Sequence, residues 1–170
     1  LQSNILAELS ASLGYGLSLK PNDVALCYLP FPHLFERVIW SALRTTGASM
    51  GFFRGEAALL IEDVKLLKPT LFASVPRIYN KVQGAILAKI EALGMVAKKL
   101  AKFAIAKKLA NLNSHQHYTH WLFDALVFNK MKEGLGGRVR FMVTGSAPIE
   151  KNVLDFLKIA FQCPVLEAYG

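Results

Sequence analysis

The 170 residues predict an α/β fold in which a mostly parallel sheet is flanked by helices. Short β-rich runs alternate with longer helical segments along the chain. Each run is mostly apolar instead of alternating between apolar and polar positions, which indicates strands buried on both faces, as in a parallel sheet. A chain of this length can form one domain with a sizeable core.

Five strands and six helices are expected, and several of their boundaries have a local cause. Pro69 stops one helix and starts the next strand, because the residue before a proline avoids the helical region. Pro32 can occupy the first turn of a helix, and Pro148 is expected to open the last one. The expected strands are Val24–Pro30, Ala48–Phe53, Thr70–Val75, Arg138–Thr144 and Val165–Tyr169. The expected helices are Asn4–Leu19, His33–Thr46, Glu56–Leu67, Arg77–Leu112, Tyr118–Lys132 and Ile149–Phe161, with a loop at Asn113–His120.

The composition is that of a globular, basic chain. Hydrophobic residues make up 53% and charged residues 19%, which excludes a disordered or low-complexity segment. The net charge of +8 suits nucleic acid, anionic lipid or phosphorylated substrates without choosing among them. Cys27 and Cys163 have neither metal spacing nor a disulfide framework. No metal site is expected, because a cluster of histidines lacks a second ligand pair: His115, His117 and His120.

Both ends of the chain indicate an internal piece of a longer protein. The chain begins at Leu1 without an initiator methionine or a signal peptide, and it stops at Gly170 on an apolar, strand-like run. Its longest apolar stretches, about a dozen residues or fewer, are too short for a transmembrane helix.

The segment from Arg138 to Pro148 is the most informative for function. It is a buried strand that runs into the small-residue turn Gly145-Ser146-Ala147 and then into a helix. The turn is expected at the carboxyl end of a strand, where open α/β sheets bind ligands. Small side chains let a flat ring approach the backbone, and N–H groups near a helix start favour electron-rich groups. An ordinary strand-to-helix turn is the alternative, because such turns are common.

Two further segments place polar residues at the start of a helix. His33 follows a strand, and the helix dipole there disfavours its charged form, so a neutral imidazole could contact a carboxylate or act as a gate. A capping or packed histidine is the alternative. Arg77 follows the buried strand Thr70–Val75 and could bind an anionic ligand, with a structural salt bridge as the alternative.

The run from Lys81 to Lys108 carries seven lysines and one acid, Glu91, with apolar residues interleaved. A basic amphipathic helix can lie on an anionic membrane surface. A solvated helix face that packs its other side on the sheet is the alternative.

Five segments match the motifs of one family, in order and with similar spacing. Together they resemble the long-chain acyl-CoA synthetases, which are the long-chain fatty acid–CoA ligases of the adenylate-forming superfamily. One motif alone is modest support, whereas five in register over almost the whole chain are strong. The segments are Leu29–Arg37 (Leu-Pro-x-x-His-x-Phe-Glu-Arg), the glycine-rich Gly51–Gly55, Thr70–Arg77 (within Pro-Thr-x-x-x-x-Val-Pro-Arg), Gly136–Pro148 (Gly-Gly-Arg-Val-Arg…Gly-x-Ala-Pro) and Tyr169-Gly170 (Tyr-Gly-x-Thr-Glu).

The resemblance implies a reaction and its partners. Residues 1–170 would form part of the large N-terminal AMP-binding domain. The carboxylate of a fatty acid would attack the α-phosphate of ATP, in the presence of Mg²⁺, to give acyl-adenylate and pyrophosphate. Coenzyme A would then take the acyl group as a thioester. Fatty acid, ATP and coenzyme A are the implied partners, and no nucleic acid is expected.

The resemblance also assigns roles to individual residues. His33 would stand near the carboxylate or gate an acyl tunnel that Phe72 and Val75 help to line. Tyr169 would stack on the adenine base, and Gly170 would lie near the acyl-adenylate. The adenine site would be lined by Gly145, Ser146, Ala147 and Pro148.

Parts that the reaction needs would lie outside these residues. The family's phosphate loop would precede Leu1, and the glutamate that holds Mg²⁺ would follow Gly170, as would a C-terminal domain with the catalytic lysine. Because this catalysis depends on positioning and on stabilising phosphate charge, the chain by itself is expected to be inactive.

Two other interpretations stay open at this point. The charge and the lysine-rich run suit a non-enzymatic basic module that binds anionic membrane or nucleic acid. A superfamily member acting on an aryl or amino acid is the other, although Glu36-Arg37 after the His33 motif favours long-chain fatty acids by resemblance. An enzyme handling fatty acids is expected inside the cell, at the cytosolic face of a membrane such as the endoplasmic reticulum or mitochondrion.

Overall fold

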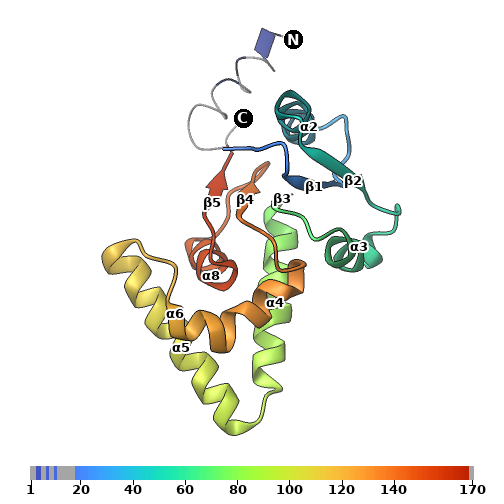
Figure 1. Ribbon diagram of the computed structural model, residues 1–170. Coiled ribbons are helices and arrows are strands. Elements are labelled where there is room, and N and C mark those ends of the chain that lie inside the picture. The colour runs from blue at the N-terminus through green and yellow to red at the C-terminus, as the bar shows by residue number, and fades with distance from the viewer. Residues whose placement is uncertain (1–2, 5–6, 8–9, 11–17, 169–170) are drawn as a thin grey trace.

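The computed structural model describes residues 3–4, 7, 10 and 18–168 of the chain. At its centre is a five-stranded sheet in which every neighbouring pair of strands runs parallel, in the order β2-β1-β3-β4-β5 (Figure 1). The expected α/β fold with a parallel sheet is therefore confirmed. The strands are β1 (Val24–Cys27), β2 (Ser49–Phe52), β3 (Leu71–Ser74), β4 (Phe141–Thr144) and β5 (Val165–Glu167).

Helices cover both faces of this sheet, because alternate strand residues point to opposite sides. Leu71, Phe141 and Val143 pack with α2 on one face, whereas Phe72 and Met142 join a larger core with α3, α4, α5 and α8 on the other. The helices are α2 (Leu34–Thr46), α3 (Leu60–Leu67), α4 (Pro76–Glu91), α5 (Met95–His115), α6 (Trp121–Phe123), α7 (Asn129–Lys132) and α8 (Lys151–Phe161). Short 3₁₀ helices are η1 (Ala57–Leu59) and η3 (Glu133–Leu135), and η2 (Asp124–Phe128) is a π-helical segment. Within the described residues, no helix combines the length and apolarity needed to cross a bilayer.

Each expected strand is present but shorter than predicted, and most helix boundaries differ; α3 begins at Leu60, and α5 extends to His115 into the predicted loop Asn113–His120. The prediction of one continuous helix for Arg77–Leu112 is wrong. The helix is interrupted between α4 and α5, where Gly94 has a low helix propensity. Pro148 does not open the last helix, which begins three residues later at Lys151. The segment predicted as the helix Tyr118–Lys132 is divided among α6, η2 and α7. The predicted helix Asn4–Leu19 falls mostly outside the described residues.

Thr70 joins the amino ends of the central strands. Its backbone N–H donates to the Val24 carbonyl at 2.8 Å, and its own carbonyl accepts from Arg140 N–H at 2.9 Å. Its hydroxyl donates to a carboxylate oxygen of the buried Asp23 at 2.6 Å. The Arg140 guanidinium binds both oxygens of the same carboxylate. One buried carboxylate thereby fixes β1, β3 and β4 relative to one another.

A second buried charge secures the helical layer. Lys108 of α5 is fully buried and donates to Asp124 and to the Ile159 carbonyl in the last turn of α8, where carbonyls lack helical partners. Its ammonium also lies 3.9 Å from the centre of the Phe128 ring. Burial lowers the pKa of Lys108, and the ion pair with Asp124 opposes this effect. Lys108 therefore links α5 to α8 and is not part of the solvated lysine face.

We expect replacement of Asp23 to make the free energy of unfolding less dependent on pH in the acid range. Burial alone would raise the pKa of Asp23, but hydrogen bonds from Arg140 and Thr70 outweigh it and lower the pKa from 3.8 to about 2. A lowered folded-state pKa gives stability above the unfolded pKa that is lost as pH falls through the folded one. Asp23→Asn should lose ~2 kcal/mol near neutral pH, and this deficit should shrink as pH falls from about 4 to about 2. Thermal unfolding of the full-length protein measures it, with the exposed Glu56→Gln as control. A deficit that does not vary with pH would contradict the assignment.

We expect Lys108→Ala to destabilise the full-length protein by roughly 3–5 kcal/mol, because it leaves the Asp124 carboxylate and the Ile159 carbonyl without their partner. The neighbouring Lys107 is exposed, so Lys107→Ala should change stability by less than about 0.5 kcal/mol. Denaturant titration of both variants makes the comparison. Equal effects would show that Lys108 has no structural role.

Candidate functional site

The carboxyl ends of the parallel strands share one edge of the sheet. Ser74 at the end of β3 is in register with Thr144 at the end of β4, and Thr144 with Glu167 of β5. The turn that follows β4, residues 145–148, leaves the sheet at this edge. This is where open parallel sheets bind ligands, so the predicted location of the turn is confirmed.

The turn after β4 combines a buried glycine with three exposed residues. A Cβ atom at Gly145 would lie 3.0 Å from two ring carbons of Phe35, so a larger residue fits here only if that ring moves. Ser146 has a left-handed backbone with φ of 69°, which is uncommon for a residue other than glycine. Ser146, Ala147 and Pro148 are exposed. The turn therefore presents backbone and small side chains to solvent.

The contact between Phe35 and Gly145 brings the start of α2 against this turn. His33 is the N-cap residue of α2, is exposed, and makes no side-chain capping hydrogen bond in the described part of the chain. Its role near a carboxylate or as a gate stays a prediction. The structure thus brings together two of the segments singled out in the sequence.

A buried polar group beside this edge was missed in the sequence. Glu36 is 3% exposed, and burial raises its pKa to about 7, partly offset by a hydrogen bond with Cys27. The pKa of the Cys27 thiol is raised to about 12, mainly by burial and to a smaller extent by the nearby Glu36. A signal was available, because Glu36 falls on the same helical stripe as the apolar Ile39 and Leu43 of α2.

Hydroxyl groups mark the other face of the same edge. Tyr28 donates to the Ser74 hydroxyl at 2.6 Å, and burial raises the pKa of Tyr28 above its ordinary value. Thr144 is 2% exposed, and within the described residues its hydroxyl has no hydrogen-bond partner. A buried, unpaired hydroxyl is costly, so this position favours a ligand or water that completes it.

The remaining predicted residues come from β3 and the start of α4. Phe72 is almost fully buried between the rings of Tyr28 and Tyr79, and Val75 is half-buried at the N-cap of α4. Arg77 is exposed, and among the described residues it forms no ion pair, so the predicted alternative of a structural salt bridge is not observed. Their tunnel-lining and anion-binding roles stay predictions.

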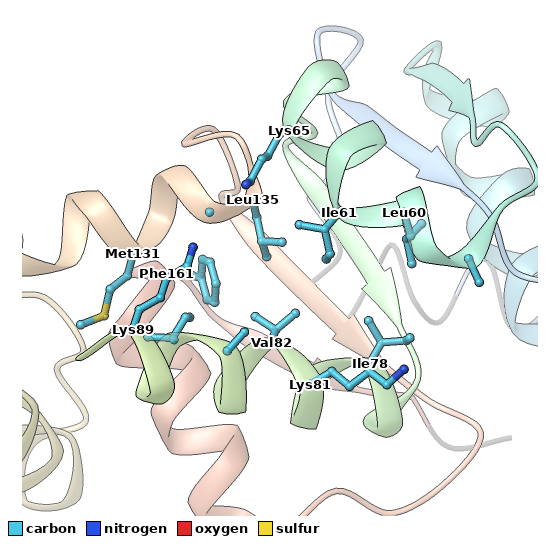
Figure 2. Close-up of a pocket in the computed structure, with 14 residues that line it drawn as sticks. Leu60, Ile61, Lys65, Ile78, Lys81, Val82, Lys89, Met131, Leu135 and Phe161 are labelled. Atoms are coloured by element: carbon cyan, nitrogen blue, oxygen red, sulfur yellow. The ribbon is translucent and has the colours of Figure 1, made fainter. Parts of the chain in front are cut away.

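An apolar cavity of about 250 Å³ lies on the helical side of the domain, between α3, α4 and the segment that precedes β4. Figure 2 shows Ile61, Val82 and Leu135 lining it from these three elements. Exposed lysines also line it: Lys65, Lys81 and Lys89. Neither Phe72 nor Val75 contributes to this lining.

Two predicted residues, Tyr169 and Gly170, lie outside the described residues. Over the part of the chain that is described, no group of three or more His, Cys, Asp or Glu side chains is arranged to hold a metal ion.

Comparisons with curated proteins point to one group of enzymes. The chain is 40% identical over 168 residues to long chain acyl-CoA synthetase 7, peroxisomal, of Arabidopsis thaliana, covering 98% of this chain and 24% of that protein. It is 41% identical over 150 residues to long-chain-fatty-acid–CoA ligase 1 of Homo sapiens, covering 88% of this chain and 21% of that protein. The chain thus spans about a quarter of the length of the curated relatives it matches.

Solved structures share the fold, and a family model matches the sequence. The A-PCP didomain of carboxylic acid reductase from Segniliparus rugosus, in complex with AMP, superposes with a TM-score of 0.62 at 19% identity, over 96% of this chain and 21% of that one. The adenylation domain of the carboxylate reductase from Mycobacterium chelonae gives 0.58 at 23% identity, over 95% of this chain and 23% of that one. The model described as AMP-binding enzyme matches residues 2–170. Because that match covers nearly the whole chain, the chain belongs to the AMP-binding enzyme family.

Proposed function

We propose that the chain is part of a ligase that activates long-chain fatty acids with ATP and transfers the acyl group to coenzyme A. The observation that carries this proposal is the similarity to long-chain acyl-CoA synthetases along nearly the whole chain. The non-enzymatic alternative, a basic module for membrane or nucleic acid, has no support in these relatives. A different acid, such as an aryl or amino acid, would also be at odds with their names.

The residues at the sheet edge suit recognition of the nucleotide. Exposed small residues of the turn, Ser146 and Ala147, leave room for a flat base, and Pro148 adds an apolar surface beside them. Gly145 lets the chain pass close to Phe35, which keeps the turn against the sheet. We propose that adenine binds along residues 145–148, that Tyr169 stacks on it and that Gly170 lies near the acyl-adenylate.

The start of α2 suits the acid. His33 is exposed and lies two residues before Phe35, which packs against the turn. An imidazole there can donate a hydrogen bond to a carboxylate or limit access to it. Phe72 and Val75 are proposed, by resemblance, to border the acyl chain. Arg77 is proposed to bind an anion, because it is exposed at the start of α4. Mg²⁺ and coenzyme A are proposed for the full-length protein, where Mg²⁺ would neutralise phosphate charge.

We also propose a peripheral contact of this enzyme with the cytosolic face of a membrane, through the segment Lys81–Lys108. The lysines of this segment, apart from the buried Lys108, support it. Basic residues near an anionic lipid surface are attracted to it.

Thioester formation tests the ligase proposal. The full-length protein is expected to convert palmitate to its coenzyme A thioester with consumption of ATP and release of AMP and pyrophosphate. Aryl acids and amino acids serve as parallel substrates. Activity restricted to one of those acids, or none with any acid, would overturn the fatty acid assignment.

We expect Gly145→Ala to raise the KM for ATP about tenfold, equivalent to ~1.4 kcal/mol of binding, because the new Cβ displaces Phe35 and the turn. The KM for coenzyme A should change little. Gly84→Ala in α4 is the matched control, since a Cβ there meets nothing within 4 Å. Steady-state kinetics of both variants in the full-length protein make the comparison. An unchanged KM for ATP in Gly145→Ala would remove the turn from the nucleotide site.

A further inference from the structure

The corner between α4 and α5 projects away from the sheet. The two helices meet at Ala92–Gly94, and Figure 1 shows this corner at the end of the helical layer farthest from the strands. We call Leu93, Met95 and Val96 the tip; their exposed fractions are 45%, 74% and 83%. Large apolar side chains gathered at a protruding corner are unusual for a surface that faces water alone.

The apolar surface continues from the tip along α5. Val96, Leu100 and Phe103 are spaced by four and three residues, so they lie on one side of the helix, and all three are exposed. Leu100 also lines a groove of about 270 Å³ between α4, α5 and η2, together with Leu93 and the exposed Leu126. The exposed apolar surface is therefore contiguous and not a set of scattered residues.

The packing of α5 explains why these side chains are held outward. The buried residues of α5 are Ala101, Ala104 and Lys108, spaced by three and four positions on one side of the helix. Two small side chains and the buried Lys108 ammonium let α5 approach α8 closely. In the second half of α5, Ile105, Leu109 and Leu112 pack partly buried against the core. In its first half, Val96, Leu100 and Phe103 lie outside the packed side and stay exposed.

Lysines surround the tip. Lys98 and Lys102 both bind Glu91, the one acid in the run Lys81–Lys108. The exposed Lys89 lies four residues before Leu93, and the exposed Lys99 follows Val96 by three. Positive charge close to exposed aliphatic side chains is complementary to a bilayer surface with anionic headgroups over acyl chains. Nucleic acid would instead favour exposed aromatic rings for base stacking, and the tip is aliphatic.

We propose that the α4–α5 tip inserts Leu93, Met95 and Val96 among the lipids of an anionic membrane surface. The surrounding lysines then reach the phosphate headgroups, because their flexible stems extend along the apolar surface. This inference deepens the proposed membrane contact by assigning it to the tip and to aliphatic insertion, instead of to the lysine face alone. In this arrangement the end of the helical layer faces the membrane, and the sheet edge lies farther from it.

Vesicle binding by the full-length protein tests the insertion. Vesicles contain equal parts of phosphatidylcholine and phosphatidylserine, with phosphatidylcholine vesicles for comparison. The double variant Met95→Glu with Val96→Glu should reduce co-sedimentation about tenfold, because charges are expelled from the apolar layer. The matched control is Leu66→Glu on α3, a residue 85% exposed and outside the tip. It should bind like the unaltered protein.

A fluorescent reporter separates the tip from other membrane contacts of the full-length protein. An environment-sensitive dye on Val96→Cys should shift to the blue and brighten with the mixed vesicles, whereas the same dye on Leu66→Cys should not. An unshifted dye at position 96 while the protein sediments with vesicles would overturn the proposal, as would equal binding by the Met95→Glu, Val96→Glu variant. Absence of binding by the unaltered protein would overturn it as well.

The ligase proposal is read out separately. Thioester formation from palmitate in detergent micelles should be the same for the tip variant and the unaltered protein. Loss of vesicle binding with intact activity supports the tip proposal. Absence of activity in both proteins would contradict the ligase assignment. It would not change what the vesicle experiment says about the tip.

Discussion

The arrangement of the sheet depends on one buried carboxylate. Asp23 accepts hydrogen bonds from Thr70 and Arg140, and its own backbone carbonyl accepts from Ser49 at the start of β2. Residues far apart in the sequence are thereby held at the amino ends of four strands. Because parallel strands rise equally per residue, fixing one end aligns the other. The edge at the carboxyl ends of the strands, where we propose that the nucleotide binds, is therefore ordered from the opposite end of the sheet.

At that opposite edge, α2 and the turn after β4 pack together at Gly145. The ring of Phe35 fills the space that a side chain would take, so α2 and the turn after β4 cannot move independently. On the other face, the Thr144 hydroxyl, which has no partner among the described residues, and the Tyr28–Ser74 hydrogen bond place polar groups in an otherwise apolar core. The apolar cavity of Figure 2 lies in a separate part of the helical layer.

Much of the fold followed from local sequence patterns. Apolar runs such as Thr70–Val75 locate strands buried on both faces, and Pro69 and Pro76 set boundaries through backbone restrictions that act within one or two residues. The turn at residues 145–148 was predictable for the same reason. The break at Gly94 was not, because a glycine within an apolar helical pattern is tolerated in one helix and terminates another, as Gly84 within α4 demonstrates.

Burial of charged groups escaped prediction because it depends on tertiary partners. Lys108 looks like the other lysines of its run, and only the approach of Asp124 and α8 makes it a core residue. Glu36 carried a weak signal in its helical position in α2, but its neighbour Cys27 comes from another element, β1. Local patterns report which residues share an element, and they report the partners across elements poorly.

The long connection between β3 and β4 has a consequence for how the chain tolerates change. Leu71 to Ser74 pair in register with Phe141 to Thr144, and residues 75–140 form the crossover, with α4 and α5 inside it. The entropy lost on closing a loop grows only logarithmically with its length, so even doubling a crossover costs about 0.6 kcal/mol more. The corner at Gly94 can therefore gain or lose residues while the register of the central strands stays the same. Chain length and composition at this corner are free to vary with the surface that the domain meets, independently of the chemistry at the sheet edge.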